Sequence, residues 1–432
     1  MKKIFLFLAI IPMFLLGSCE KELLNPNAAT SEDVLNSVDG LLGMVVGLKR
    51  SFSVGATSTI YAMVSANGMT TKELFVINTG NADLASLEAG AQTLNNNNSF
   101  VRNIWENCNI VNTNSQILID NVDNISDAAT ANTVLAYAHL FKALAIGTLA
   151  QFFEQVPVQT STSSDFLAGK FATFVPRAQA LQEAISLLEA AAALNVTPSA
   201  LFNSKVGTDI SINNALQALL ARYYNMVGNN DKALEAAGKV DLASKSIFKY
   251  DVLNQNPVFR TSLVNNNTYN GVFNFGLTGE LAPDPADGRI VFYLADNPAT
   301  NVKVQGFFKS DTDAIPFYLP GEMLLIRAEA FARKGQIVEA ITELDKVLTK
   351  TNDAYGVNAK LQAYSGAQTA EAVLLEIYKN RCIELYMTGL KLEDSRRFGR
   401  PGAPSSERSR NFYPYPINER DNNPNTPADP QI

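Results

Sequence analysis

The chain has 432 residues, 47% of them hydrophobic and 18% charged, so it can bury a large core and has room for more than one domain. Its formal charge is −7, from 35 Lys and Arg against 42 Asp and Glu. An acidic chain without a basic stripe argues against nucleic acid as a partner.

The N-terminal residues 1–18 have the features of a secretory signal peptide. Lys2 and Lys3 precede an apolar stretch, residues 4–16, that is too short to span a bilayer. Elsewhere no uninterrupted apolar run approaches the roughly 18 residues that a transmembrane helix needs. We therefore expect the mature protein to be a soluble body with no membrane-spanning helix.

Cys19 stands directly after two small residues, Gly17 and Ser18, which suit the pocket of a signal peptidase. This arrangement resembles the lipobox of bacterial lipoproteins, in which the Cys becomes the N-terminus and carries acyl chains such as palmitate. Two or three acyl chains hold a protein stably on a membrane, whereas a single chain binds only marginally. The resemblance implies a lipid anchor on Cys19, a tether over residues 19–30 and one folded body over 31–432. The alternative is an ordinary signal whose cleavage site happens to fall near a Cys.

Helical periodicity dominates the first half of the chain. Apolar residues recur at three- and four-residue steps, which is the pattern of a helix with a buried face. One segment opens at Ser31, an N-cap candidate, and another stops at Val156-Pro157 because proline does not continue a helix. The predicted helices are residues 31–50, 101–123, 131–153 and 178–195.

Two later segments, residues 212–241 and 318–349, share a pattern of small, aromatic, Gly and small residues at an offset of 107. This spacing resembles the tetratricopeptide helix–turn–helix unit, in which small residues let two helices approach and Gly permits a left-handed exit from the first. The alternative is two ordinary helical hairpins that share Ala and Gly. The matching positions are Ala221 and Ala328, Tyr224 and Phe331, Gly228 and Gly335, Ala233 and Ala340, and Val240 and Val347.

Residues 71–100 and 253–317 are loop-like and rich in Asn, Gly and aromatic residues. Alternating apolar and polar residues predict short strands at 271–275 and 289–293. Long irregular insertions in a helical chain commonly carry function, and aromatic rings with amide and carboxylate groups are suited to sugars. The candidate ligand-binding residues are Phe75, Asn81, Asp83, Tyr269, Asn270, Phe292 and Tyr293. The alternative for each ring is that it caps the core beneath the loops.

Support for catalysis is thin, and we predict no catalytic residue, metal or cofactor. His139 is the only histidine and lies in an apolar helical segment, so a buried structural imidazole is expected and zinc or triad chemistry has little to work with. Glu280, Asp284 and Asp287 miss the residue order of a calcium loop and are expected to form a polar turn. A carboxylate pair for glycoside hydrolysis stays open, because its spacing in space is invisible in a sequence.

Two cysteines follow Cys19, and both have apolar, helix-like surroundings. Cys108 lies in N-C-N-I-V and Cys382 in R-C-I-E-L. An oxidising envelope would permit a disulfide between them. We expect two inert buried thiols instead.

The C-terminal fifth reads IYKNRCIELYMTGLKLEDSRRFGR (377–400) and then RNFYPYPINERDNNPNTPADP (410–430). With the lipobox-like Cys19, WENCNIVNTN at 105–114 and AYAHLFKALAIGTLAQFFEQVPV at 136–158, this segment resembles the SusD/RagB family of outer-membrane nutrient-binding lipoproteins. The resemblance covers nearly the whole mature chain. Each motif is weak alone, but their order and spacing together are specific.

Charged residues of the C-terminal segment are suited to ion pairs that tie the last helices to their neighbours. The F-Y-P-Y-P run at 412–416 is expected to lie extended against the body, since neither proline offers a backbone donor. The residues expected to form ion pairs are Arg381, Glu384, Glu393, Asp394, Arg396 and Arg397.

The family resemblance implies a mainly α, SusD-like fold with tetratricopeptide-like helix pairs and an irregular loop-rich region with short strands. It also implies a cell-surface lipoprotein of the outer membrane that binds an oligosaccharide and passes it to a SusC-like TonB-dependent transporter. A peptide replaces the sugar in RagB-like members. A secreted glycosidase and a tetratricopeptide scaffold of the envelope are the remaining alternatives.

Overall fold

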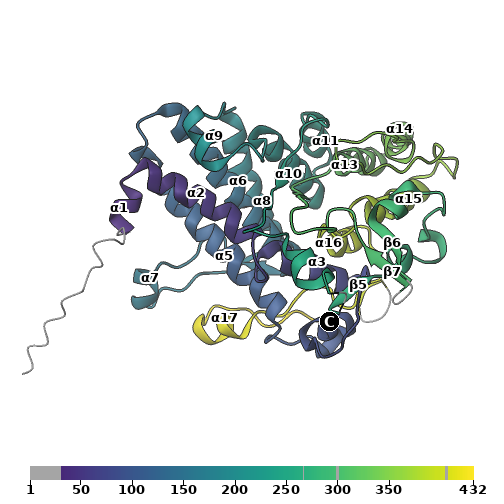
Figure 1. Ribbon diagram of the computed structural model, residues 1–432, viewed down its shortest axis with the longest axis horizontal. Helices are drawn as coiled ribbons and strands as arrows, with labels where there is room; N and C mark the ends of the chain where they lie inside the picture. Colours follow the sequence, from purple (N-terminus) through teal and green to yellow (C-terminus); the bar gives the residue numbers. More distant parts are fainter. Residues whose placement is uncertain (1–30, 266, 298–300, 404–406) are drawn as a thin grey trace, which may run out of the picture.

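A computed structural model of the chain describes residues 31–265, 267–297, 301–403 and 407–432. The signal peptide, the lipidated Cys19 and the tether predicted within residues 1–30 lie outside the described residues. Helices make up most of the described chain, with short strands in a loop-rich region, so the prediction of a mainly α fold is confirmed (Figure 1).

The longest helix, α6 (Ala128–Phe152), lies at the centre of the first half and packs between α5 (Ser99–Asp120) and α8 (Arg177–Ala193). Its N-terminus is capped by Asp127, whose carboxylate accepts a hydrogen bond from the Thr130 amide at 2.8 Å. Its length and hydropathy would suit a membrane span, but 89% of its most apolar stretch is buried inside the fold. An almost continuously apolar sequence is therefore explained by burial on every side.

The remaining helices of the first half surround this centre. The predicted helix 31–50 is divided in two, because the Ser37 side chain accepts a hydrogen bond from the Gly40 amide at 3.1 Å and starts a new helix. The helices are α1 (Ser31–Leu35), α2 (Val38–Ser53), α3 (Thr59–Thr70), α4 (Ala82–Ala89), α7 (Ser163–Leu167) and α9 (Ala200–Val206).

Helix pairs form at both segments with the tetratricopeptide-like pattern. The first pair is α10 (Ile212–Met226) with α11 (Asn230–Gly238), and the second is α13 (Pro320–Arg333) with α14 (Ile337–Leu348). Gly228 and Gly335 each have φ +76°, the left-handed conformation expected of them. The four matched alanines are fully buried, and α11 packs against α13, so the two pairs form one stack (Figure 1).

The C-terminal segment supplies α15 (Ala370–Glu384), α16 (Lys391–Arg397) and α17 (Ile417–Asn422). Its predicted ion pairs are present. They are Arg381–Asp394 at 2.9 Å, Glu384–Arg289 at 3.1 Å, Glu393–Arg177 at 2.6 Å, Arg396–Glu393 at 2.7 Å and Arg397–Glu329 at 2.8 Å. Each pair has at least one almost fully buried side chain, so these charges are part of the core.

The tail at 412–416 lies against the body as predicted. Tyr413 and Tyr415 are at most 1% exposed. The ring of Tyr413 stacks on Phe152 with centroids 5.3 Å apart, and its amide donates to the Phe152 carbonyl at 2.8 Å. The tail therefore closes the C-terminal end of α6.

The described strands form four antiparallel pairs rather than one sheet. β1 (Leu74–Val76) pairs with β5 (Tyr269–Gly271), β2 (Gln155–Val156) with β3 (Val175–Pro176), β4 (Ile247–Phe248) with β8 (Ile315–Pro316), and β6 (Leu294–Asn297) with β7 (Asn301–Val304). The β1–β5 pair joins the two predicted loop regions, 71–100 and 253–317.

The strand predicted at 289–293 is wrong, because these residues form α12 (Gly288–Tyr293). Asp287 starts this helix by accepting a hydrogen bond from the Arg289 amide at 2.9 Å, and a buried Asp287–Arg289 ion pair of 2.7 Å holds the turn.

The strand predicted at 271–275 is largely wrong as well. Only its first residue, Gly271, belongs to β5, and the 3₁₀ turn Phe273–Gly276 follows. Asn274 and Phe275 have φ of 54° and 59°, which turns the chain back and buries the Phe275 ring completely.

Candidate ligand-binding surface

Three of the seven predicted ligand residues lie in the core. Tyr269, Asn270 and Tyr293 are each at most 1% exposed. The Tyr269 hydroxyl lies 3.0 Å from that of Ser65, the Asn270 Oδ1 accepts from the Val304 amide at 2.9 Å, and the Tyr293 hydroxyl donates to the Glu384 carbonyl at 2.9 Å. These side chains offer a ligand no open ring face or amide, and we do not keep them as proposed contacts.

Phe75 and Phe292 are half-buried and belong to different elements. Phe75 lies in β1, opposite Asn270 of β5. The Phe292 ring packs edge-on against Tyr293 and Phe307, with centroids 4.8 and 5.4 Å away. For Phe292 the geometry corresponds to a ring that caps the core beneath the loops.

Asn81 and Asp83, at the start of α4, line an open pocket of about 390 Å³ that we call the α4 pocket. Its walls come from both predicted loop regions and from α3 and α5. The described lining residues are Tyr61, Asn81, Ala82, Asp83, Leu84, Ser99, Phe100, Thr261 and Thr268. The volume falls within the range usual for small-ligand sites.

The α4 pocket combines a fixed carboxylate with an aromatic pair. Asp83 Oδ2 accepts hydrogen bonds from the amide of Ser99, at 3.1 Å, and from its hydroxyl. Phe100 follows at the first turn of α5, and its half-buried ring packs on Tyr61 with centroids 5.6 Å apart and an angle of 47°. Asp83 is the one charged side chain among the described residues of the wall.

Two hydroxyls face this pocket without an internal partner. Thr261 and Thr268 make no side-chain hydrogen bond within the described part of the chain. Sequence reasoning missed both, as it missed Tyr61 and Phe100. The N-cap pattern Asn98-Ser99 just before Phe100 was a usable signal, because it places that ring at the exposed end of a helix.

A second open recess of about 540 Å³, which we call the α7 cleft, lies between α5, α17 and the hairpin arm 157–176 that carries α7. In Figure 1, α7 projects from the body beside α5, with α17 below it. The described lining residues are Trp105, Glu106, Asn109, Ile110, Thr113, Asn114, Pro157, Thr160, Ser161, Phe166, Phe171, Ala172, Glu419, Asn422 and Asn423. None of them was among the sequence candidates.

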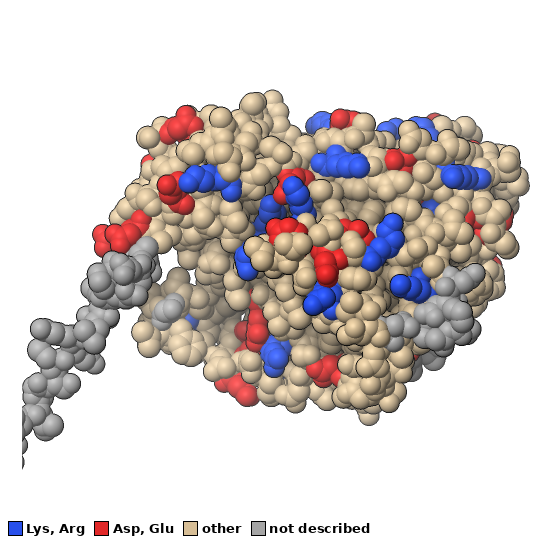
Figure 2. Space-filling model, in the orientation of Figure 1, with Lys and Arg blue, Asp and Glu red and all other residues tan. Residues whose placement is uncertain are grey.

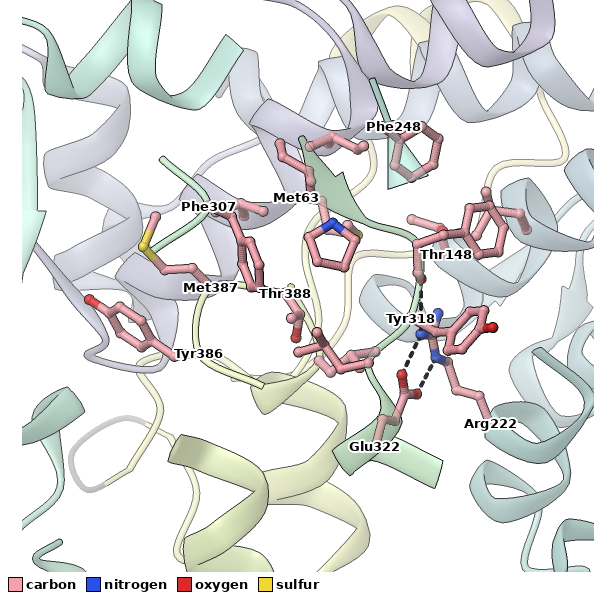
Figure 3. Close-up of a pocket in the computed structure, with 18 of the residues that line it drawn as sticks. Met63, Thr148, Arg222, Phe248, Phe307, Tyr318, Glu322, Tyr386, Met387 and Thr388 are labelled. Atoms are coloured by element: carbon pink, nitrogen blue, oxygen red, sulfur yellow. Dashed lines mark hydrogen bonds and ion pairs between the residues drawn. The ribbon is translucent and has the colours of Figure 1, made fainter. Parts of the chain in front are cut away.

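The third space is an interior cavity of about 60 Å³ between α3, α13 and the turn before α16 (Figure 3). Met63, Phe307 and Met387 lie at one side of it, and the buried Arg222–Glu322 pair, with contacts of 2.6 and 2.8 Å, lies at the other. This volume is well below the roughly 300–1,000 Å³ that is usual for small-ligand sites.

The calcium candidates form polar turns. Glu280 pairs with Arg400 at 3.4 Å, Asp284 accepts from the Ala286 amide at 2.8 Å, and Asp287 caps α12. Across the described residues, no group of three or more His, Cys, Asp and Glu side chains is arranged to hold a metal ion.

His139 is half-buried in α6, where burial and then the nearby Lys142 lower the pKa of its imidazole. Cys108 and Cys382 are both free and buried, as expected of inert thiols. Burial raises the pKa of each thiol to about 12, so neither is a thiolate at neutral pH.

Comparison with known proteins identifies structures with the same overall architecture. No protein-family model matches the sequence, and a search of curated proteins finds no relative. Solved structures do match. A SusD superfamily protein from Bacteroides thetaiotaomicron aligns over 91% of this chain and 99% of its own, with TM-score 0.69 and 18% identity. The chain has the SusD-like fold.

Two further neighbours of this fold carry a binding description. A SusD-like carbohydrate binding protein from Bacteroides fragilis aligns over 91% of this chain and 99% of its own, with TM-score 0.69 and 14% identity. Another, from Bacteroides vulgatus, covers 84% of each chain with TM-score 0.63 and 17% identity. At these identities the likeness concerns the SusD-like fold itself.

Surface charge on this SusD-like chain is mixed on the face that Figure 2 shows. Lys and Arg are interspersed with Asp and Glu over the middle of that face, and uncharged residues cover most of the rest. Such a face has no extended stripe of one sign to attract a polyelectrolyte.

Proposed function

We propose that this chain is a nutrient-binding protein of the SusD/RagB type that binds an oligosaccharide in the α4 pocket and does not cleave it. The observation that carries the proposal is the convergence of both predicted loop regions on one open pocket. Its wall has an aromatic pair and two threonines whose side chains make no hydrogen bond within the described residues. The carbohydrate-binding descriptions of structural neighbours support the ligand class.

The chemistry of the α4 pocket suits a sugar with few charges. Phe100 offers part of an apolar ring to C–H groups, while Asn81, Thr261 and Thr268 offer hydrogen bonds to hydroxyls. Asp83 already accepts two hydrogen bonds from Ser99, which fixes its orientation as a sugar acceptor. Glycoside hydrolysis commonly uses two carboxylates that flank the scissile bond. The described wall residues of the α4 pocket include one carboxylate, Asp83.

The proposal extends to delivery. We propose that Cys19 is acylated, that the protein sits on the outer surface of the outer membrane, and that a SusC-like TonB-dependent transporter receives the ligand. A Cys19→Ser variant should leave the membrane fraction and appear in the soluble fraction. An unchanged distribution between the two fractions would refute the anchor.

Native gels that contain soluble polysaccharides test the ligand class. Retardation by one polysaccharide, with no new reducing ends after incubation, is the expected result. The Thr261→Ala/Thr268→Ala variant should bind about 30-fold more weakly, since each of the two lost hydrogen bonds is worth roughly 1 kcal/mol. Asn97→Ala, an exposed neighbour outside the pocket wall, is the matched control and should bind normally.

Three outcomes would replace the proposal. Release of reducing sugar would indicate a glycosidase. Binding to peptides from a peptide array, without binding to any glycan, would indicate a RagB-like peptide binder. Affinity for neither, together with a stable protein partner other than a barrel transporter, would indicate a scaffold.

A further inference from the structure

The α7 cleft is a preformed recess rather than a gap beside a loose loop. The β2–β3 pair closes the base of the arm, and a capping box between Thr162 and Asp165 orders α7. The Thr160 hydroxyl lies 2.6 Å from that of Thr113 on α5. A recess held in shape on several sides binds a ligand with little ordering cost.

The C-terminal tail fixes the other edge of the arm. Asn423 Nδ2 donates to the Ala172 carbonyl at 3.0 Å, and Asn425 Nδ2 donates to the Phe171 carbonyl at 3.3 Å. The walls therefore come from three segments far apart in the sequence, α5, the arm and α17, and hydrogen bonds link them.

Aromatic rings line one side of the cleft. Phe166 is 51% exposed and meets Phe171 edge to face, with centroids 5.7 Å apart. Trp105, also on the wall, is 2% exposed, stacks on Phe174 with centroids 5.7 Å apart and donates its Nε1–H to Glu419 at 3.0 Å. The exposed ring of Phe166 is suited to contact the apolar face of a pyranose.

Polar groups line the cleft as well. Asn114 and Ser161 make no side-chain hydrogen bond within the described residues, so their donors and acceptors are available to a ligand. Asn422 adds an exposed amide at the rim. Amides and hydroxyls of this kind match the donors and acceptors of sugar hydroxyls.

The charge of the cleft wall favours neutral sugars over anionic ones. Glu106 and Glu419 are the ionisable side chains of the described wall, and neither Lys, Arg nor His is among them. The Glu419 side chain accepts from Trp105 and from Asn423, at 3.0 and 2.8 Å, which fixes its orientation. Two carboxylates without a cation repel uronic acids and sulfated sugars.

We propose that the α7 cleft is a second carbohydrate-binding site, specific for a short neutral oligosaccharide. It shares its ligand class with the function proposed above, but it uses none of the residues of the α4 pocket. Its volume, about 540 Å³, lies in the usual range for small-ligand sites.

The single tryptophan makes the site directly testable, because Trp105 lines this cleft and is absent from the wall of the α4 pocket. Purified full-length protein is titrated with maltohexaose, xylohexaose and cellohexaose as neutral probes, and with oligogalacturonate as the anionic probe. Tryptophan fluorescence reports the α7 cleft, and calorimetry reports all binding. We expect a saturable fluorescence change with at least one neutral probe and none with oligogalacturonate.

Matched variants then assign the signal. Phe166→Ala should weaken the fluorescence-detected affinity at least about fivefold. Leu167→Ala, on the same arm, 86% exposed and outside the cleft wall, should leave it unchanged. If Phe166→Ala proves unstable, Ser161→Leu serves in its place, because it replaces a polar group of the wall with a larger apolar one and should weaken the fluorescence-detected binding. Calorimetric binding to the α4 pocket should survive in all three.

Several results would overturn the second site. In the first, calorimetry detects binding of neutral probes, this binding is lost in Thr261→Ala/Thr268→Ala, and no probe changes the tryptophan fluorescence. The α4 pocket would then be the one proposed site that is supported. Equal responses of Phe166→Ala and Leu167→Ala would also overturn it, as would a fluorescence response to hexapeptides but to no sugar, or to no probe at all.

Discussion

The buried charges between α15, α16 and α13 support a quantitative prediction. The Asp394 carboxylate accepts from Arg381 through Nε and Nη2, both at 2.9 Å, and also from Arg397. The Asp394 and Arg381 side chains are 3% and 2% exposed. Burial alone would raise the pKa of Asp394, but Arg381 and Arg397 together outweigh it and hold the pKa below its ordinary value.

Asp394→Asn keeps the shape of this side chain and removes its charge. The buried Arg381 guanidinium then lacks its carboxylate, whereas Arg397 keeps its contact with Glu329 at 2.8 Å. Leaving one buried charge unpaired costs about 3–5 kcal/mol in the free energy of unfolding. For 432 residues the entropy of unfolding is about 0.9 kcal/mol/K, so the melting midpoint should fall by about 3–6 °C.

Scanning calorimetry at pH 7 measures this midpoint, with Glu235→Gln as the control. Glu235 pairs with Lys232 and Lys239 on an exposed helix face, where the same change from acid to amide should leave the midpoint unaltered. Equal shifts in the two variants, or no shift in Asp394→Asn, would refute the assignment of the Asp394 network to the core.

The pH dependence provides a second readout for the same variant. The pKa of Asp394 is lower in the folded state, so its stabilising contribution is complete above the unfolded pKa of about 4. That contribution is lost as the pH falls through the lower folded value. The gap between wild type and Asp394→Asn should therefore narrow below about pH 4.

The other predictions concern a carboxyl, a turn and two thiols. Burial raises the pKa of Glu73 to about 7. The free energy of unfolding of the wild type should therefore fall by up to roughly 3 kcal/mol as the pH rises from about 4.5 to 7. In urea melts Glu73→Gln should show a flatter pH dependence. A steeper fall in Glu73→Gln would contradict this. Gly335→Ala should lower the free energy of unfolding by about 1 kcal/mol, because Gly335 has φ +76°. Gly43→Ala, on the exposed face of α2, should raise it by up to about 1 kcal/mol. A change in the same direction in both variants would count against the turn argument. Cys108 and Cys382 should react with a thiol reagent only after denaturation, and fast labelling of either residue in the native protein would contradict their burial.

The helices were predictable because their signals are local. Burial of α6 on all sides follows from its continuous apolar sequence, and the turns after α10 and α13 follow from Gly228 and Gly335. α12 was not predictable in this way. The alternating residues Arg289 to Tyr293 are compatible with a strand and with a short helix. The helix forms with Arg289 buried, and its guanidinium pairs with Glu384 of α15 at 3.1 Å, a contact that the local sequence does not report.

The ligand surface was predictable only in part, for the same reason. The sequence predicts loops both around Asn81 and Asp83 and around Tyr269 and Tyr293. In the structure Asn81 and Asp83, at the start of α4, line a pocket, whereas Tyr269 and Tyr293 lie in the core. The difference depends on pairing with β1 and on contact with α15, at sequence separations that no local pattern reports. Phe166 escaped notice because a short polar arm gives no periodic signal.

The two proposed sites share α5, and this geometry leads to a last prediction. Phe100 and Asn109 are nine residues apart, so they lie about 14 Å apart along the helix axis and on opposite faces. A glycan chain long enough to reach both sites would bind the second one intramolecularly, at a high effective concentration. A polysaccharide should therefore bind more tightly than a hexasaccharide of the same linkage, and either Phe166→Ala or Thr261→Ala/Thr268→Ala should remove that advantage while single-site hexasaccharide binding persists. A polymer-to-hexamer affinity ratio that is the same in wild type and both variants would show that the two recesses do not act on one chain.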